Sequence, residues 1–146
     1  MIKNEREYRI SRTRAAKIEK ELEDLLQQSA SRATPTNMER SQTKVLCSQV
    51  SELRSKLAEY EALKSGKVKR FGARTFDDLP AVLIQARIAN GMSQKDLASQ
   101  MGVKEQQVQR YEATNYATAS FGRVKSIIRI LGLTIHEEIS LIGPRS

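Results

Sequence analysis

Apolar residues in the first half of the chain recur at the spacing of two helices. Between residues 12 and 28 they follow the i, i+4, i+7, i+8 spacing of one helix face, with Ser11 as a suitable N-cap. From residue 38 to about residue 64 the spacings alternate between four and three, which is a heptad seam formed by Leu46, Val50, Leu53, Leu57 and Tyr60. The Ser- and Thr-rich segment between the two stretches contains Pro35 and indicates a loop. The pattern therefore predicts an antiparallel, coiled-coil-like hairpin.

The two predicted helices differ in length. At about 1.5 Å per residue, the second spans roughly 40 Å and the first roughly 25 Å. The shorter helix would leave part of the heptad seam exposed to water. We expect a second copy of the chain to cover it, and the alternative is that the C-terminal half folds back onto it.

The second half of the chain contains four short helical patterns, each with start and stop signals. Pro80 suits a first helical turn, Ser93 with Asp96 forms a capping box, and Gly102 suits a left-handed turn. The four helices are predicted at about 78–91, 93–102, 104–113 and 120–132.

The second and third of these helices match what a steep helix crossing requires. Two helices joined by a turn of three or four residues need a small side chain at the crossing, here Ala98, and a flexible turn, here Gly102. Val108 and Tyr111 would hold the third helix in place. Its remaining side chains are polar and suit hydrogen bonds to base edges and phosphates: Lys104, Glu105, Gln106, Gln107, Gln109 and Arg110.

Residues 76–133 resemble the lambda-repressor/Cro (XRE) family of helix-turn-helix transcription regulators. The matching positions are Gln94, Leu97, Ala98, Gly102, Val103, Val108 and Glu112. The resemblance implies a DNA-binding domain of four or five helices that usually acts as a dimer. It also implies that Arg87 in the first of these helices pairs with Glu112 at the end of the recognition helix.

The resemblance further implies the residues that contact double-stranded DNA. It places Gln94 at a phosphate, Glu105, Gln106 and Arg110 over bases, and Lys104 and Gln109 at the edge of the contact. Glu105 is a departure, because a carboxylate there either accepts from a cytosine amine or weakens binding. The loop at 113–119 is also nearly uncharged, so backbone contacts are expected from Asn115, Tyr116, Arg123 and the linker instead.

That linker, residues 67–75, divides a hairpin unit at 1–66 from a helix-turn-helix unit at 76–146. The stretch from 65 to 75 has two glycines, no acidic residue and four basic ones, Lys67, Lys69, Arg70 and Arg74. It is either a hinge exposed to solvent or a basic arm on the DNA. At the other end of this unit, residues 134–142 fit a short strand or a short helix. We favour a strand that pairs across a dimer, with His136 on the surface.

Composition narrows the functional class. Lys and Arg exceed Asp and Glu by 25 to 17, and this charge of +8 favours a polyanionic partner. With one cysteine and one histidine, we expect no intrachain disulfide, no metal site, no catalytic residues and no cofactor. The sequence has no secretory signal pattern and no apolar stretch of ~18 residues, so we expect a cytoplasmic protein without a membrane partner.

These features support three hypotheses. The first is a dimeric repressor that binds a pseudo-palindromic operator. The second is an antitoxin that regulates its own operon and neutralises a toxin protein through its N-terminal region. The third is a structural adaptor that no longer binds DNA, which the polar recognition helix argues against. The sequence does not separate the first two.

Overall fold

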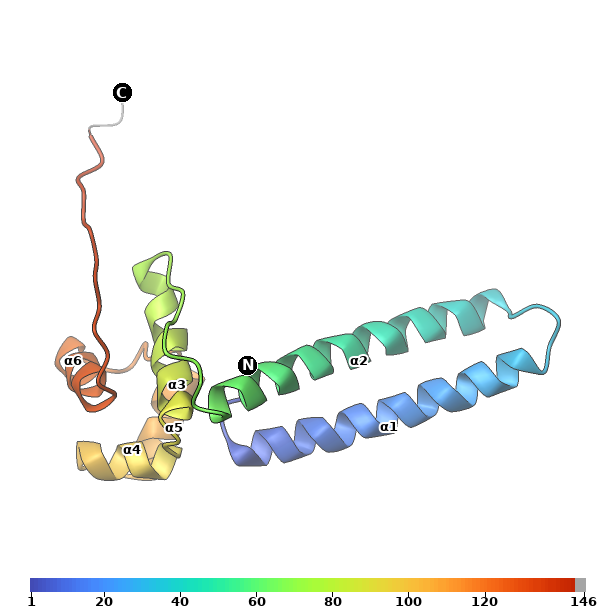
Figure 1. Ribbon diagram of the computed structural model, residues 1–146, viewed down its shortest axis with the longest axis horizontal. Coiled ribbons are helices and arrows are strands. Elements are labelled where there is room, and N and C mark those ends of the chain that lie inside the picture. The colour runs from blue at the N-terminus through green and yellow to red at the C-terminus, as the bar shows by residue number, and fades with distance from the viewer. Residues whose placement is uncertain (144–146) are drawn as a thin grey trace.

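The computed structural model describes residues 1–143, and every regular element in that range is helical, as predicted. Two long helices, α1 (Glu5–Ala30) and α2 (Asn37–Lys64), form an antiparallel hairpin that projects from a group of shorter helices (Figure 1). None of the described helices has the length and hydrophobicity to cross a membrane. A short 3-10 turn, η1 (Phe76–Asp78), precedes the shorter helices, which are α3 (Leu79–Ala89), α4 (Gln94–Met101), α5 (Glu105–Ala113) and α6 (Phe121–Ile130).

The predicted start of α1 is wrong. The helix begins at Glu5, and Asn4 rather than Ser11 is the N-cap, since its side chain accepts a hydrogen bond from the Glu7 amide at 2.9 Å. Two acidic residues in the first turn add a favourable interaction with the helix dipole. With 26 residues in α1 and 28 in α2, the helices are nearly equal in length. The expectation that α1 leaves part of α2 uncovered is therefore also wrong.

The heptad seam of α2 faces α1, and its burial decreases away from the base of the hairpin. Leu57 and Tyr60, near the base, are buried, whereas Leu46, Val50 and Leu53 are only half-buried. The distal half has no third layer of side chains, because nothing in the described chain packs over it (Figure 1). The hairpin is therefore packed most tightly where it joins the short helices.

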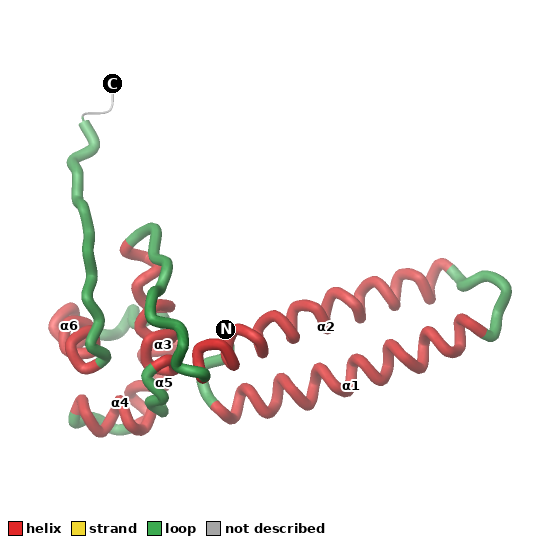
Figure 2. Tube along the Cα trace, viewed as in Figure 1, coloured by secondary structure: helices red, strands yellow, loops and turns green. Residues whose placement is uncertain are grey.

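The linker is not a free hinge. It runs back alongside α3 as the green segment beside that helix in Figure 2, and its apolar residues Val68 and Phe71 pack against the core. At its end, the Asp78 carboxylate accepts hydrogen bonds from the Arg74 and Thr75 amides, at 2.7 and 3.1 Å. The four basic side chains of the linker remain exposed.

The signals predicted for the short helices are confirmed. Ser93 and Asp96 form the capping box of α4, with the Ser93 amide 2.8 Å from the Asp96 carboxylate and the Asp96 amide 3.0 Å from the Ser93 hydroxyl. Gly102 ends α4 with a φ of 69°, in the left-handed region that favours glycine. Ser120 caps α6 by accepting from the Arg123 amide.

One hydrophobic core joins the hairpin to the short helices. Leu57, Tyr60 and Leu63 of α2 belong to the same buried cluster as Leu83 and Ile84 of α3. The cluster also includes Ala15 of α1 and Ile2, which precedes α1. The hairpin is thus packed against the helix-turn-helix unit and is not merely tethered to it.

The favoured C-terminal strand is not present in the described chain. Residues 133–143 form neither strand nor helix and extend away from α6 (Figure 1). A strand requires hydrogen bonds from a neighbouring strand, and residues 1–143 provide no sheet to supply them. Ile139, Leu141 and Ile142 are almost fully exposed in this segment. Residues 144–146, the end of the predicted second unit, lie outside the described residues.

Candidate nucleic-acid interface

The exposed face of α5 carries the side chains that the sequence placed there. Val108, Tyr111 and Glu112 are buried, which turns Gln106 and Arg110 outward, one helical turn apart. Glu105 and Gln109 are also exposed, and the Gln109 amide donates to the Glu105 carboxylate at 3.3 Å. Lys104 is exposed at the N-cap position.

A groove along one side of α5 brings four of the predicted site residues together. Lys104, Gln106 and Arg110 line it from the recognition helix and Arg123 from the first turn of α6. No carboxylate is among the lining residues, which Val103, Gln107 and Tyr111 complete. The groove thus presents three cationic side chains beside the outward face of α5, which suits a phosphate backbone.

The other side of α5 faces the start of the hairpin. Glu105, Gln109 and Ala113 line a cleft of about 700 Å³ together with residues of the first turns of α1, including Arg6 and Ile10. Apart from Asn115, the predicted site residues therefore divide between a cationic groove and a cleft of mixed charge. Sequence reasoning missed this cleft, because it depends on where the hairpin packs.

Gln94 does not lie on the surface. Its side chain is 6% exposed, and its amide nitrogen donates to Glu112 Oε2 at 2.7 Å. Its amide oxygen accepts from Asn4 Nδ2 at 3.4 Å. Both ends of the amide are thus bonded inside the protein, and a side-chain contact with phosphate would require these bonds to break.

Arg87 and Glu112 form the ion pair that the resemblance implied. The guanidinium meets the carboxylate through two bonds, Nε to Oε1 at 2.6 Å and Nη2 to Oε2 at 3.0 Å. The two side chains are 2% and 0% exposed. Arg87 also donates to the Met92 carbonyl at 2.7 Å and the Lys3 carbonyl at 2.6 Å. A bidentate pair of this kind holds α3 and α5 at a defined angle.

The loop between α5 and α6 contains two residues in the left-handed region, Asn115 at a φ of 50° and Tyr116 at 59°. Asn115 is exposed, so it remains able to contact DNA. Tyr116 is buried and stacks on Tyr111 with ring centroids 6.0 Å apart, which contradicts its expected surface role. Burial raises the pKa of Tyr116, whose hydroxyl has no hydrogen-bond partner among the described residues.

Comparison with known proteins supports the assignment of this region. Residues 83–137 match the family model described as Helix-turn-helix. Searches of curated proteins and of solved structures gave no match. The matched segment includes all of α4, α5 and α6 and most of α3. Residues 83–137 are therefore a helix-turn-helix domain of the lambda-repressor-like type, as the sequence predicted for this part of the chain.

Proposed function

We propose that this protein is a dimeric repressor that binds a pseudo-palindromic operator. The observation that carries the proposal is the exposed polar face of α5 beside a groove lined by Lys104, Arg110 and Arg123. Side chains of these types, on a helix held in place by a buried ion pair, suit insertion into the major groove.

The exposed residues have separate proposed roles. Gln106 and Arg110 read base edges, because a glutamine amide pairs with adenine and a guanidinium with guanine through two hydrogen bonds. Glu105 accepts from a cytosine amine, and Gln109 supports it through their mutual hydrogen bond. The remaining contacts are to phosphates, from Lys104, Asn115 and Arg123. Gln94 acts from within, as a support for Glu112.

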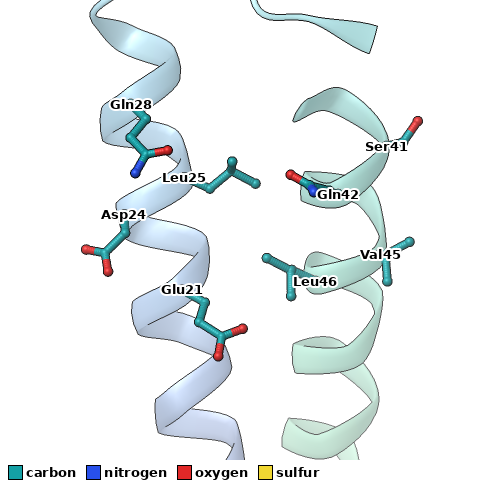
Figure 3. A pocket seen from close by; sticks show the side chains of 8 residues that line it. All are labelled: Glu21, Asp24, Leu25, Gln28, Ser41, Gln42, Val45 and Leu46. Atoms are coloured by element: carbon teal, nitrogen blue, oxygen red, sulfur yellow. The ribbon is translucent and has the colours of Figure 1, made fainter. Parts of the chain in front are cut away.

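The proposed dimer forms through the distal half of the hairpin. There a groove of about 590 Å³ lies between α1 and α2, and Leu25 and Leu46 point toward one another across it (Figure 3). Val45 at the same groove is 54% exposed, and Met38, about two turns away on the same face of α2, is 71% exposed. A second hairpin would cover these side chains and turn a two-helix layer into a four-helix bundle. The extended C-terminal segment is the alternative interface.

Selection from a pool of random duplexes with the full chain, followed by sequencing, tests this function. We expect an enriched site with two inverted half-sites about one helical turn apart, or a multiple of it, because each subunit reads one half-site. Light scattering of the same sample should give the mass of two chains. Failure to enrich any sequence would refute operator binding. An enriched site without inverted symmetry, bound by a monomer, would refute the dimer alone.

The antitoxin hypothesis makes a different prediction about the same hairpin. The exposed apolar side chains of the distal half would then contact a toxin protein rather than a second copy. Co-expression with the product of a neighbouring toxin-like gene would then yield a stable complex that still binds the operator. Without such a complex, the repressor function stands by itself.

A further inference from the structure

Residues 2–4, which we call the anchor segment, contact three helices of the helix-turn-helix domain. Ile2 is 4% exposed and lies in the shared core. The Lys3 ammonium donates to the Glu112 carbonyl in the last turn of α5 at 2.9 Å, and the Lys3 carbonyl accepts from Arg87 of α3. Asn4 donates to Gln94 in the first turn of α4. The bond from Lys3 to Glu112 thus joins the anchor segment to the end of the recognition helix, 109 residues further along the chain.

The anchor segment completes the hydrogen bonding of the buried ion pair. The carboxylate of Glu112 accepts from both Arg87 and Gln94, and the guanidinium needs further acceptors for its remaining N–H groups. Lys3 supplies one of these through its carbonyl. A buried N–H group without a partner is costly, so loss of this contact would weaken the network that holds α5.

The anchor segment is also continuous with the hairpin. Asn4 is the N-cap of α1, and in the next turns Tyr8 stacks on Tyr60 of α2 with ring centroids 5.1 Å apart. The Tyr8 hydroxyl donates to Glu61 at 2.7 Å. Together with the packing of α2 on α3, these contacts fix the base of the hairpin to the helix-turn-helix domain at two places.

We propose that the anchor segment positions the recognition helix, so that DNA affinity depends on Ile2, Lys3 and Asn4. The proposal rests on the DNA-binding role proposed above for α5. In this arrangement a partner that moves the base of the hairpin also changes the Arg87–Glu112 network, and hence the angle at which α5 meets DNA. The hairpin is then a part of the DNA-binding unit as well as a site of assembly.

The decisive variant is Ile2→Ala, because it removes buried contact without changing charge. Lys3→Met removes the bond to α5 and keeps the Lys3 carbonyl, and Asn4→Ser keeps an N-cap oxygen but is too short to reach Gln94. Ile2→Val is the conservative variant. The matched control is Leu22→Ala in the distal half of α1, which weakens the hairpin away from the anchor segment.

Two measurements on the full-length variants test the proposal. The first is amide hydrogen exchange in residues 105–113. The second is affinity for a duplex that carries one half-site selected by the wild-type chain, compared with a random duplex. We expect Ile2→Ala to raise exchange in α5 and to weaken half-site binding by about 2- to 30-fold, with a smaller loss on random DNA. In Ile2→Val both quantities, exchange in α5 and half-site affinity, should stay close to the wild-type values. Leu22→Ala should change neither.

The outcomes separate the anchor from the underlying function. If the wild-type chain prefers the half-site and Ile2→Ala binds that half-site equally tightly, the anchor proposal is wrong, whereas the proposal of operator reading is unaffected. If the wild-type chain shows no preference for any duplex, the DNA-reading role itself fails. Should Ile2→Ala not fold, Lys3→Met carries the test, and unchanged exchange in α5 in that variant would overturn the positioning role.

Discussion

Glu112 accepts hydrogen bonds from three distant parts of the chain. Its side chain is fully buried, accepts from Arg87 and Gln94, and lies in the same turn as the exposed Arg110. Its own carbonyl accepts from Lys3. A buried carboxylate of this kind stabilises one arrangement of helices only while every partner is present.

Removing either member of the Arg87–Glu112 pair should therefore strongly destabilise the fold. We expect Arg87→Ala and Glu112→Ala each to lower the free energy of unfolding by about 3 kcal/mol or more, because the remaining charge stays buried without its partner. The double variant should lose less than the sum of the two, since contacting residues couple. Chemical denaturation measures all three.

Arg54→Ala provides the control for that experiment. Arg54 and Glu19 form a two-bond pair of similar geometry across the hairpin, at 2.7 and 2.6 Å, but it lies on the surface. Solvent screens such a pair, so its removal should change stability little. Equal losses for Arg54→Ala and Arg87→Ala would contradict the role assigned to burial.

Base reading by α5 can be tested at single residues. Gln106→Ala and Arg110→Ala should each weaken binding to the selected operator by ~1–3 kcal/mol, because each removes hydrogen bonds to a base edge. In Gln106→Ala, binding to random duplexes should change much less, because the glutamine side chain is uncharged and its removal leaves the attraction to phosphates unchanged. Titrations with both duplexes measure the difference. An equal loss on the two duplexes would show that these side chains do not read sequence.

At the scale of elements, local signals in the sequence predicted the short helices well. Ser93, Asp96 and Gly102 act through bonds and backbone angles within a few residues, so their roles follow from the sequence around them. The start of α1 was missed because it lacks the apolar spacing of the later turns and depends on a cap at Asn4. The burial of Gln94 was missed for a different reason, since its partners Asn4 and Glu112 come from distant parts of the chain.

The α4 capping box should make part of the stability dependent on pH. Hydrogen bonds from the Ser93 side chain and amide hold the pKa of Asp96 below its usual value. A carboxyl group with a lowered folded-state pKa stabilises the fold above its unfolded pKa of about 3.9, and this contribution is lost as pH falls through the folded pKa.

Asp96→Asn tests this dependence. The variant should be less stable than the wild type at pH 5, and the difference in unfolding free energy should shrink as the pH approaches 2. Urea denaturation across this range measures it. A difference that stays constant from pH 5 to pH 2 would show that the charge of Asp96 contributes nothing to the cap.

The sequence predicted a hairpin unit and a helix-turn-helix unit, and in the structure the two share one hydrophobic core. The hairpin and the helix-turn-helix unit were separable in the sequence because each has its own periodicity and a Gly-containing linker lies between them. Packing of the C-terminal half on the hairpin was an alternative that the sequence left open, but the residues of the shared core could not be predicted, since Ile2 and Leu63 meet side chains of α3 to α6. The exposed face of α5 was predictable because helical periodicity alone determines it.

The proposed dimer is a property of the whole molecule. The seam residue Leu57 is 3% exposed and packs within the chain, so its substitution would unfold the hairpin and reveal little about assembly. The exposed residues Met38 and Val45 are better probes. We expect Val45→Asp combined with Met38→Asp to yield monomers by light scattering, because two carboxylates from each chain would have to be buried between hairpins.

Ser51→Asp is the matched control, because Ser51 is exposed on α2 about a third of a turn away from Val45. It adds charge to the same helix and should leave the dimer intact. The monomeric variant should keep its helix content and its affinity for a single half-site, and lose the additional affinity that two linked half-sites provide. A dimer that survives both substitutions would instead place the interface in the exposed C-terminal segment, where Leu141→Asp should then dissociate it.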